Sequence, residues 1–307
     1  MASEPAPTND HTQDQQDQGK APAPSAAHDS AHGQRQGPEA ARLQGHWLLA
    51  KLGKRVLRPG GIELTRQLLG ATDLRPGRRI VELGPGVGRT AEILLDSIPA
   101  SYRGVDPNPE GREQVAAVLE GHPQAEYVVA DAASTGLPTG QTDLVVGEAM
   151  LTMQSEDAKR AIASEAARLL APGGQYAIHE LALRSDRDEA ELEAARKHLS
   201  RIIKVGARPL TQEAWCALLE ETGLEIVWTG TAPMRLLEPR RLIADEGLLG
   251  AFRFFRAVRR TPGARDRIRA MRQAFRAQGE LLTAVAIVAR KPAPSSEAGE
   301  PSDGAEH

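Results

Sequence analysis

The chain has 307 residues and a formal net charge of −3, and only 3% of its residues are aromatic. This near-neutral balance gives no electrostatic footprint for nucleic acid, and no apolar run reaches the roughly eighteen residues that a membrane span needs. Cys216 is the only cysteine, which excludes intramolecular disulfides and multi-cysteine metal clusters, so we expect a cytoplasmic protein without a bound metal.

Both ends of the chain are polar. Residues 1–40 and 292–307 contain mainly small, polar and proline residues and have no run of large apolar side chains. Such segments cannot bury enough surface to offset the entropy lost on ordering, so both are predicted to be disordered tails. Residues 41–291 are predicted to form one domain.

Between the tails, short β-rich runs alternate with segments of helical periodicity. Strands are predicted at residues 79–83, 102–105, 127–130, 142–147, 175–181, 225–229 and 282–289. Helices are predicted at residues 90–97, 110–120, 155–170 and 211–222. This alternation predicts an α/β fold, a doubly wound and mostly parallel sheet of seven strands with helices on both faces.

Two helical stretches, 186–206 and 236–278, lie outside the alternation and are predicted to form a cap at the strand ends, where such folds place substrate specificity. The second stretch is rich in arginine between residues 251 and 278, with Phe252, Phe255 and Val258 on one helical face. These basic helices could present a solvated face over a buried apolar stripe, or contact an anionic substrate or a membrane surface.

The strongest motif is a strand that runs directly into three alternate glycines. Glu82 precedes Gly84, Gly86 and Gly88, and a predicted helix follows. Glycines let the backbone pass close to a ligand, and the free N–H groups of a helix N-terminus can bind an anionic group. The dinucleotide-binding fingerprint would place its third glycine at position 89, which is Arg89.

The Glu-x-Gly-x-Gly-x-Gly run resembles the first motif of class I S-adenosylmethionine (SAM)-dependent methyltransferases. Asp106-Pro107 follows the second predicted strand and Asp131-Ala132 the third. The resemblance implies that the cofactor contacts Glu82, the three glycines, Asp106-Pro107 and Asp131-Ala132. Asp106 would accept the ribose hydroxyls of SAM, and Asp131 would accept the adenine amine. The similarity extends over residues 75–182.

The upstream stretch 44–69 is similar to the leader that quinone C-methyltransferase-like and methyltransferase type 11 small-molecule enzymes place over the cofactor. The alternative is a helix that only packs on the sheet edge through Trp47, Leu48 and Leu52. The resemblance implies a Rossmann-like methyltransferase that uses SAM to methylate a small-molecule acceptor. A NAD(P)-dependent oxidoreductase is the alternative.

Two residues at strand ends are candidates for catalysis. His179 lies near the end of the fifth predicted strand, and its unperturbed pKa near neutrality suits a general base. The alternative for His179 is a hydrogen-bonded core histidine. Glu148, after the fourth strand, is a rival base or a polar contact to the methionine end of SAM. An apolar acceptor pocket is expected to include Met150, Met153, Ile202, Ile203, Met234 and Phe255.

Overall fold

The computed structural model describes residues 48–49, 51–53, 58–203, 206–234, 237–277 and 279–293. All of them belong to one compact unit that runs from Gly37 to His307. The expected disordered tails, 1–40 and 292–307, lie outside the described residues, apart from residues 292 and 293.

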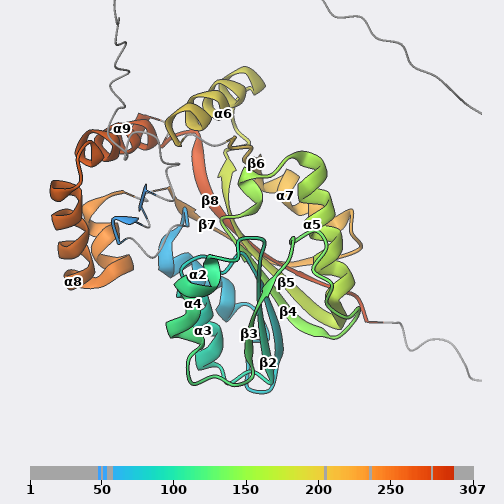
Figure 1. Cartoon of the computed structure of the whole chain (residues 1–307). Helices are drawn as coiled ribbons and strands as arrows, with labels where there is room; N and C mark the ends of the chain where they lie inside the picture. The colour runs from blue at the N-terminus through green and yellow to red at the C-terminus, as the bar shows by residue number, and fades with distance from the viewer. Residues whose placement is uncertain are drawn as a thin grey trace, which may run out of the picture. The chain divides into compact units, whose positions relative to one another are not determined.

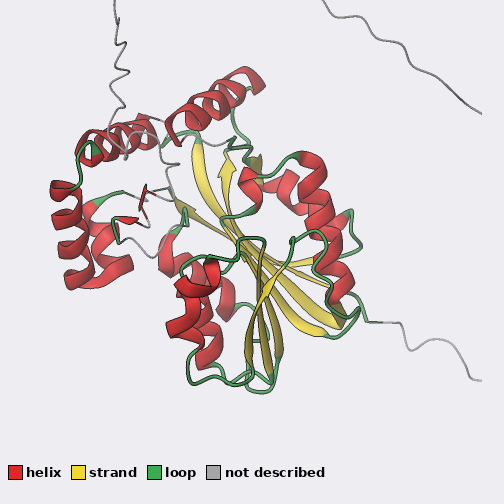
Figure 2. Ribbon diagram, in the orientation of Figure 1, coloured by secondary structure: helices red, strands yellow, loops and turns green. Residues whose placement is uncertain are grey.

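One sheet forms the centre of the fold (Figure 2). Its strand order is β3-β2-β1-β4-β5-β8-β7, with β6 paired to β5. The strands are β1 Arg79–Leu83, β2 Ser101–Asp106, β3 Ala125–Val129, β4 Thr142–Glu148, β5 Leu170–Leu183, β6 Leu210–Thr211, β7 Glu225–Pro233 and β8 Leu282–Arg290. β8 runs antiparallel to both of its neighbours, β5 and β7, and the other strand pairs among the described residues are parallel. This arrangement confirms the mostly parallel, doubly wound sheet and adds β6, whose two residues are too few to show periodicity.

Helices cover both faces of the sheet (Figure 1). One face carries α2 Gly61–Gly70, α3 Arg89–Asp96 and α4 Gly111–Leu119, and the other carries α5 Glu156–Leu169 and α7 Gln212–Glu220. Leu68 and Leu94 pack against the first face, and Ile162 and Trp215 against the second. The two apolar layers explain why the central strands are almost entirely apolar in sequence.

The remaining helices form a cap with its own apolar core. They are α6 Glu189–Ile203, α8 Pro239–Arg260 and α9 Ala264–Ala277. Leu48 and Leu52 of the N-terminal stretch join Leu199 of α6, Phe254 of α8 and Met271 of α9 in one buried cluster. Three segments that are far apart in the sequence therefore pack together beside the ends of β5 and β8.

Candidate functional site

The parallel register places the glycine loop between two acidic strand ends. Leu83, the last residue of β1, pairs with the penultimate residues of both β2 and β4. The next residues along these three strands are Gly84, Asp106 and Glu148. Since parallel strands end at the same edge of a sheet, Asp106 and Glu148 flank the start of the loop, where open α/β sheets bind their ligands.

The three glycines of the loop all adopt left-handed backbone conformations. The φ angles are 70° at Gly84, 55° at Gly86 and 77° at Gly88, a region that residues with a Cβ rarely occupy. A Cβ at Gly88 would lie 3.0 Å from a methyl group of Val118, so this glycine allows α3 to pack closely on α4. The nearest atom to a Cβ at Gly86 would be 4.0 Å away. The space above Gly86 is therefore open to a ligand.

The two aspartates lie at the same edge of the sheet. Asp106 ends β2 opposite Val129 of β3, and Asp131 lies two residues beyond that pairing. One carboxylate oxygen of Asp106 accepts the Asn108 N–H at 2.9 Å, and one oxygen of Asp131 accepts the Ala133 N–H at 2.8 Å. Within the described part of the chain, the second oxygen of each accepts no hydrogen bond and can meet a ligand donor. The neighbouring Pro107 is exposed and Ala132 is buried.

Glu82 lies beneath the glycine loop rather than on its exposed surface. Its carboxylate is buried and accepts a hydrogen bond of 2.6 Å from the hydroxyl of Tyr102. Burial raises the pKa of Glu82 to about 7, and the hydrogen bond from Tyr102 offsets only part of this effect. Glu82 therefore changes its charge close to neutral pH.

We expect the unfolding free energy of the wild type to contain a pH-dependent contribution from Glu82 that the Glu82→Gln variant lacks. The folded-state pKa of Glu82, about 7, exceeds the reference value of 4.5, so its contribution is complete below pH 4.5 and is lost as the pH rises to 7. The loss is about 3 kcal/mol. Urea unfolding between pH 4.5 and 8 should show that the difference in unfolding free energy between wild type and variant changes by this amount. Glu113→Gln, on the exposed side of α4, is the control, and a pH-independent difference would contradict the assignment.

Glu148 is the centre of a buried polar cluster beside the loop. Its carboxylate accepts hydrogen bonds from Thr65 at 2.7 Å and Thr90 at 3.3 Å, and it pairs with Arg58 at 2.9 Å and with His179 Nδ1 at 3.2 Å. Burial opposes the ionisation of Glu148, but the charge of Arg58 and the hydrogen bond from His179 outweigh it and lower the pKa to about 2. Glu148 is therefore an ionised and weakly basic carboxylate at neutral pH.

His179 is fully buried, and both ring nitrogens are engaged. Nε2 accepts the Gly60 N–H at 3.0 Å, so the ring proton lies on Nδ1, which faces Glu148. Burial lowers the pKa of His179, which keeps the ring neutral at pH 7. A general base must direct a free lone pair at its substrate, and here the lone pair of Nε2 is occupied by Gly60. This geometry argues against the general-base expectation for His179.

The turn Arg-Pro-Gly-Gly at residues 58–61 connects this cluster to the cap. The guanidinium of Arg241 on α8 donates to the Gly60 carbonyl, and Asp245 accepts the Ile62 N–H at 3.1 Å. A Cβ at Gly60 would lie 2.8 Å from His179 Nε2, so this position requires glycine. No sequence motif predicted a role for Arg58, Thr65 or Thr90, and the Arg-Pro-Gly-Gly run is the one local signal at this position.

A third buried carboxylate fixes the loop after β4. Glu180 accepts hydrogen bonds from the backbone N–H groups of Met150, Leu151 and Thr152 at 2.9, 2.7 and 3.0 Å. Ala149, which precedes this turn, has a φ of 55°, an unusual value for a residue with a Cβ. Glu180 thereby fixes the turn that directly follows Glu148.

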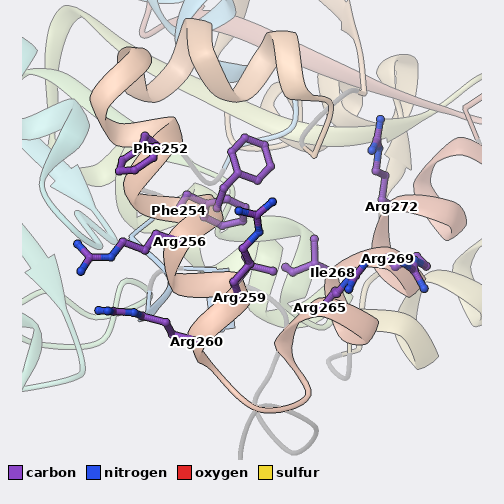
Figure 3. A pocket seen from close by; sticks show the side chains of 11 residues that line it. Phe252, Phe254, Arg256, Arg259, Arg260, Arg265, Ile268, Arg269 and Arg272 are labelled. Atoms are coloured by element: carbon purple, nitrogen blue, oxygen red, sulfur yellow. The ribbon is translucent and has the colours of Figure 1, made fainter.

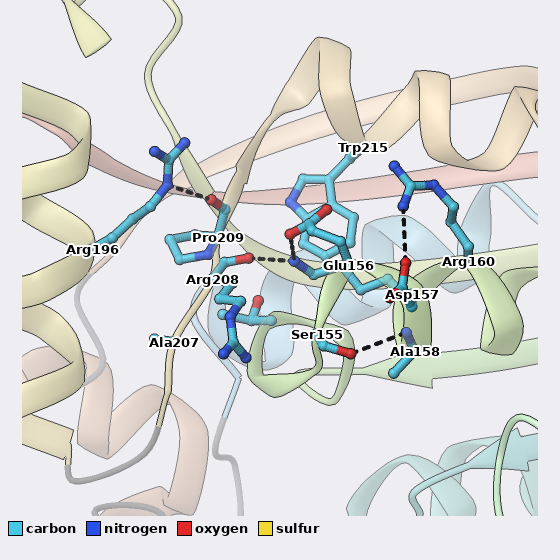
Figure 4. Close-up of polar contacts among 12 residues, drawn as sticks. Ser155, Glu156, Asp157, Ala158, Arg160, Arg196, Ala207, Arg208, Pro209 and Trp215 are labelled. Atoms are coloured by element: carbon cyan, nitrogen blue, oxygen red, sulfur yellow. Dashed lines mark hydrogen bonds and ion pairs between the residues drawn. The ribbon is translucent and has the colours of Figure 1, made fainter. Parts of the chain in front are cut away.

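A buried lysine anchors the segment that returns from α6 to the sheet (Figure 4). Lys159 Nζ donates to the Arg208 carbonyl at 2.7 Å, pairs with Glu156 at 2.8 Å, and lies 5.4 Å from the centre of the Trp215 ring. The Arg208 N–H donates to the Thr152 carbonyl at 2.7 Å. The cap is therefore attached to the same loop that Glu180 holds.

The residues expected to line an apolar acceptor pocket do not all lie in one place. Met150 and Met153 lie on the loop after β4 and are half-buried. Met234 is instead buried in the core of the cap, and Phe255 lines an outer groove between α8 and α9, so the expectation for these two residues is wrong. The side chains of Ile202 and Ile203 lie outside the described residues.

Two further properties concern the described residues as a whole. No group of three or more His, Cys, Asp or Glu side chains among them is placed to hold a metal ion. No helix in this part of the chain is long and apolar enough to cross a membrane.

Cys216 is half-buried on α7, and burial raises the pKa of its thiol, which disfavours the thiolate form.

Comparison with known proteins identifies the family. A family model for the methyltransferase domain matches residues 55–229, more than half of the chain. An uncharacterized protein of Haemophilus influenzae is 30% identical over 250 residues, which cover 80% of this chain and 98% of that protein.

Two solved structures share the fold at low sequence identity. Phosphoethanolamine N-methyltransferase 2 of Haemonchus contortus, in complex with phosphomonomethylethanolamine and S-adenosylhomocysteine, has a TM-score of 0.58 at 16% identity, covering 77% of this chain and 54% of that one. The cyclase SpnF has a TM-score of 0.56 at 18% identity, covering 75% and 80%. Enzymes of different reaction classes thus share this fold, so the fold alone does not define the reaction.

The family match does define the reaction class. The chain belongs to the methyltransferase domain family. The protein is therefore a class I SAM-dependent methyltransferase, and SAM is its cofactor, as the glycine motif and the fold led us to expect. The alternative of a NAD(P)-dependent oxidoreductase is set aside, because Arg89 also stands where that motif requires its third glycine.

Proposed function

We propose that the protein transfers the methyl group of SAM to a small-molecule acceptor and releases S-adenosylhomocysteine. The observation that carries this proposal is the loop at Gly84, Gly86 and Gly88, with open space above Gly86 and acidic strand ends on both sides. The single cysteine, Cys216, supports no intramolecular disulfide and favours a cytoplasmic setting.

The residues at this edge fit the parts of SAM. The open backbone at Gly86 allows a ligand to approach closely, and the second oxygen of Asp106 is available to accept the ribose hydroxyls. Asp131, which is exposed beyond β3, can accept a hydrogen bond from the adenine amine next to Ala132. Arg58 and Thr90, held by Glu148, lie on the opposite side of the loop and suit the charged methionine end.

The sulfonium of SAM supplies an activated methyl group for in-line displacement, so the protein has to align the acceptor and exclude water. Glu180 fixes the turn that carries Met150 and Met153, which we propose as one wall of the acceptor site. His179 and Glu148 hold the Arg58 turn in place and serve as positioning residues. We propose an acceptor whose nucleophile needs no protein base at neutral pH.

Incubation with methyl-labelled SAM and a size-fractionated cell extract would test the acceptor class. We expect the label in the fraction below about 3 kDa, together with production of S-adenosylhomocysteine. A panel of quinones, phenols, amines and natural-product intermediates would then identify the acceptor. Label recovered in protein or nucleic acid would overturn the small-molecule assignment.

Asp106→Ala is expected to weaken SAM binding by about ten- to a hundredfold. A hydrogen bond from a ligand to a charged carboxylate contributes about 1.5–3 kcal/mol, and 1.4 kcal/mol corresponds to a factor of ten. Isothermal titration calorimetry measures the change, and Asp157→Ala, whose side chain is fully exposed on α5, is the matched control. An unchanged Kd for Asp106→Ala would remove the ribose assignment.

A further inference from the structure

The second half of α8 exposes an apolar stripe. Gly247, with φ 72° and ψ 173°, breaks α8, and a new helical segment begins at Leu248. Leu248, Leu249, Phe252 and Phe255 are 75%, 73%, 66% and 45% exposed. Side chains at i, i+4 and i+7 lie on the same side of a helix, so Leu248, Phe252 and Phe255 form a continuous stripe. Monomeric proteins rarely expose a contiguous group of large apolar side chains without an interaction partner.

A basic groove runs beside this stripe. It has a volume of about 750 Å³, and α8 and α9 form its walls (Figure 3). Phe254 and Ile268 contribute to its floor. Six arginines line it: Arg256, Arg259, Arg260, Arg265, Arg269 and Arg272.

The charge of the groove is largely uncompensated. No carboxylate is among the described residues that line it. In the described part of the chain, only two of the six arginines have an acidic partner within 4.0 Å: Arg269 with Asp266 at 4.0 Å and Arg272 with Glu238 at 3.3 Å. Exposed apolar side chains and unpaired arginines therefore occupy adjoining surfaces of the same two helices.

We propose that this surface of α8 and α9 docks onto an anionic phospholipid membrane. An interfacial helix inserts its apolar side chains at the boundary between headgroups and acyl chains, and its arginines bind anionic headgroups. Leu248, Leu249 and Phe252 supply the first contact, and the groove arginines supply the second. The first half of α8 holds the Gly60 turn through Arg241, so docking would bring the methyltransferase site close to a lipophilic acceptor.

Other occupants match only part of this surface. The last fourteen residues of the chain contain four acidic residues and no lysine or arginine, but they have no large apolar side chain that could cover Phe252. A second copy of the chain would supply apolar surface, yet a symmetric contact would bring two basic grooves together. An anionic membrane matches both the apolar side chains and the positive charge.

Vesicle sedimentation with the full-length protein tests the proposal. We expect binding to phosphatidylcholine vesicles that contain about a third phosphatidylglycerol, little binding to pure phosphatidylcholine, and loss of binding at high salt. Arg256→Gln with Arg259→Gln should weaken binding by about thirtyfold, since one arginine near an anionic surface is worth about fivefold. Arg75→Gln with Arg160→Gln, two exposed arginines outside α8 and α9, should change it by much less.

The apolar contact is tested separately. The triple change Leu248→Ser, Leu249→Ser and Phe252→Ser removes only exposed side chains and should abolish vesicle binding, whereas Val227→Ser on β7 should not. Equal binding to neutral vesicles, or wild-type binding by the triple variant, would overturn the proposal.

Two further controls address the other occupants. Sedimentation equilibrium that shows a wild-type dimer and a monomeric triple variant would assign the surface to a second copy. Vesicle binding that appears only after removal of residues 294–307 would assign it to the acidic end of the chain. Either result would overturn membrane docking by the full-length protein.

Discussion

The Gly86→Val variant is expected to lose SAM binding by at least about a thousandfold in Kd while it keeps the fold. Gly86 has a φ of 55°, and the nearest atom to a Cβ there would be 4.0 Å away, so a valine side chain would occupy the space open to the cofactor. A thousandfold weaker Kd corresponds to about 4 kcal/mol. Calorimetric titration with SAM measures the effect, and thermal unfolding shows whether the fold is retained.

A matched control separates loss of the ligand from backbone strain. Valine at a left-handed position costs about 1–2 kcal/mol wherever it occurs. Gly77 has a φ of 83° with no atom within 4 Å of a Cβ, and it precedes β1 at the opposite edge of the sheet. Gly77→Val should therefore destabilise the protein to a similar extent and bind SAM normally. If Gly86→Val bound SAM within a few-fold of wild type, the glycine loop would not be the cofactor site.

The second large effect is expected for His179→Ala, which should reduce the free energy of unfolding by about 3–5 kcal/mol. The substitution leaves the buried Gly60 N–H without an acceptor, removes a hydrogen bond to Glu148, and opens a cavity in the protein interior. Urea unfolding measures the loss. His122→Ala, a partly exposed histidine after α4, should change stability little.

The pH dependence adds a second measurement at the same site. The folded-state pKa of His179 lies below its reference value of 6.5, so its contribution to stability is present above about pH 6.5 and is lost as the pH falls below it. The unfolding free energy of the wild-type protein should therefore fall with decreasing pH more than that of His179→Gln. The amide oxygen of this glutamine can still accept the Gly60 N–H, but its side chain does not titrate. Equal acid sensitivity of the two proteins would contradict the neutral, buried state of His179.

Kinetics separates a positioning role from a catalytic one. We expect His179→Gln to reduce kcat by less than about tenfold per folded molecule and to leave the pH–rate profile unchanged. Loss of a general base would instead reduce kcat by about a hundredfold or more and remove an ionisation from the profile. That outcome with stability intact would restore His179 as the base.

Local sequence determined much of the sheet and the form of the loop. The run at 79–83 was predicted with the same bounds as β1, because a short apolar strand that ends in glycines needs no distant information. β5 begins and ends outside its predicted range, at Leu170 and Leu183. The first residues of β5 pair with β4 across an irregularity, and its last residues pair with β6. The periodicity of β5 alone does not reveal either pairing partner, so it could not predict these bounds.

The tertiary structure alone decided the roles of the polar residues near the loop. The ordinary pKa of His179 suggested a base, but the fold places Gly60 on one ring nitrogen and Glu148 on the other. Arg58 and Glu148 are far apart in sequence and meet at 2.9 Å, which makes the carboxylate strongly acidic. Burial and long-range partners set the protonation states of such groups, and neither is encoded in the residues adjacent to them in sequence.

The same distinction applies to the cap. Its sequence showed helices with aromatic and basic residues, and periodicity could not determine which of the aromatics were buried. Phe254 packs into the cap core while Phe255, the next residue, is exposed beside the arginines of α9. A helix rotates by about 100° per residue, so the direction of each side chain depends on what the helix packs against. In the cap, the packing partners come from the N-terminal stretch, α6, and α8 with α9, which meet only in the folded chain.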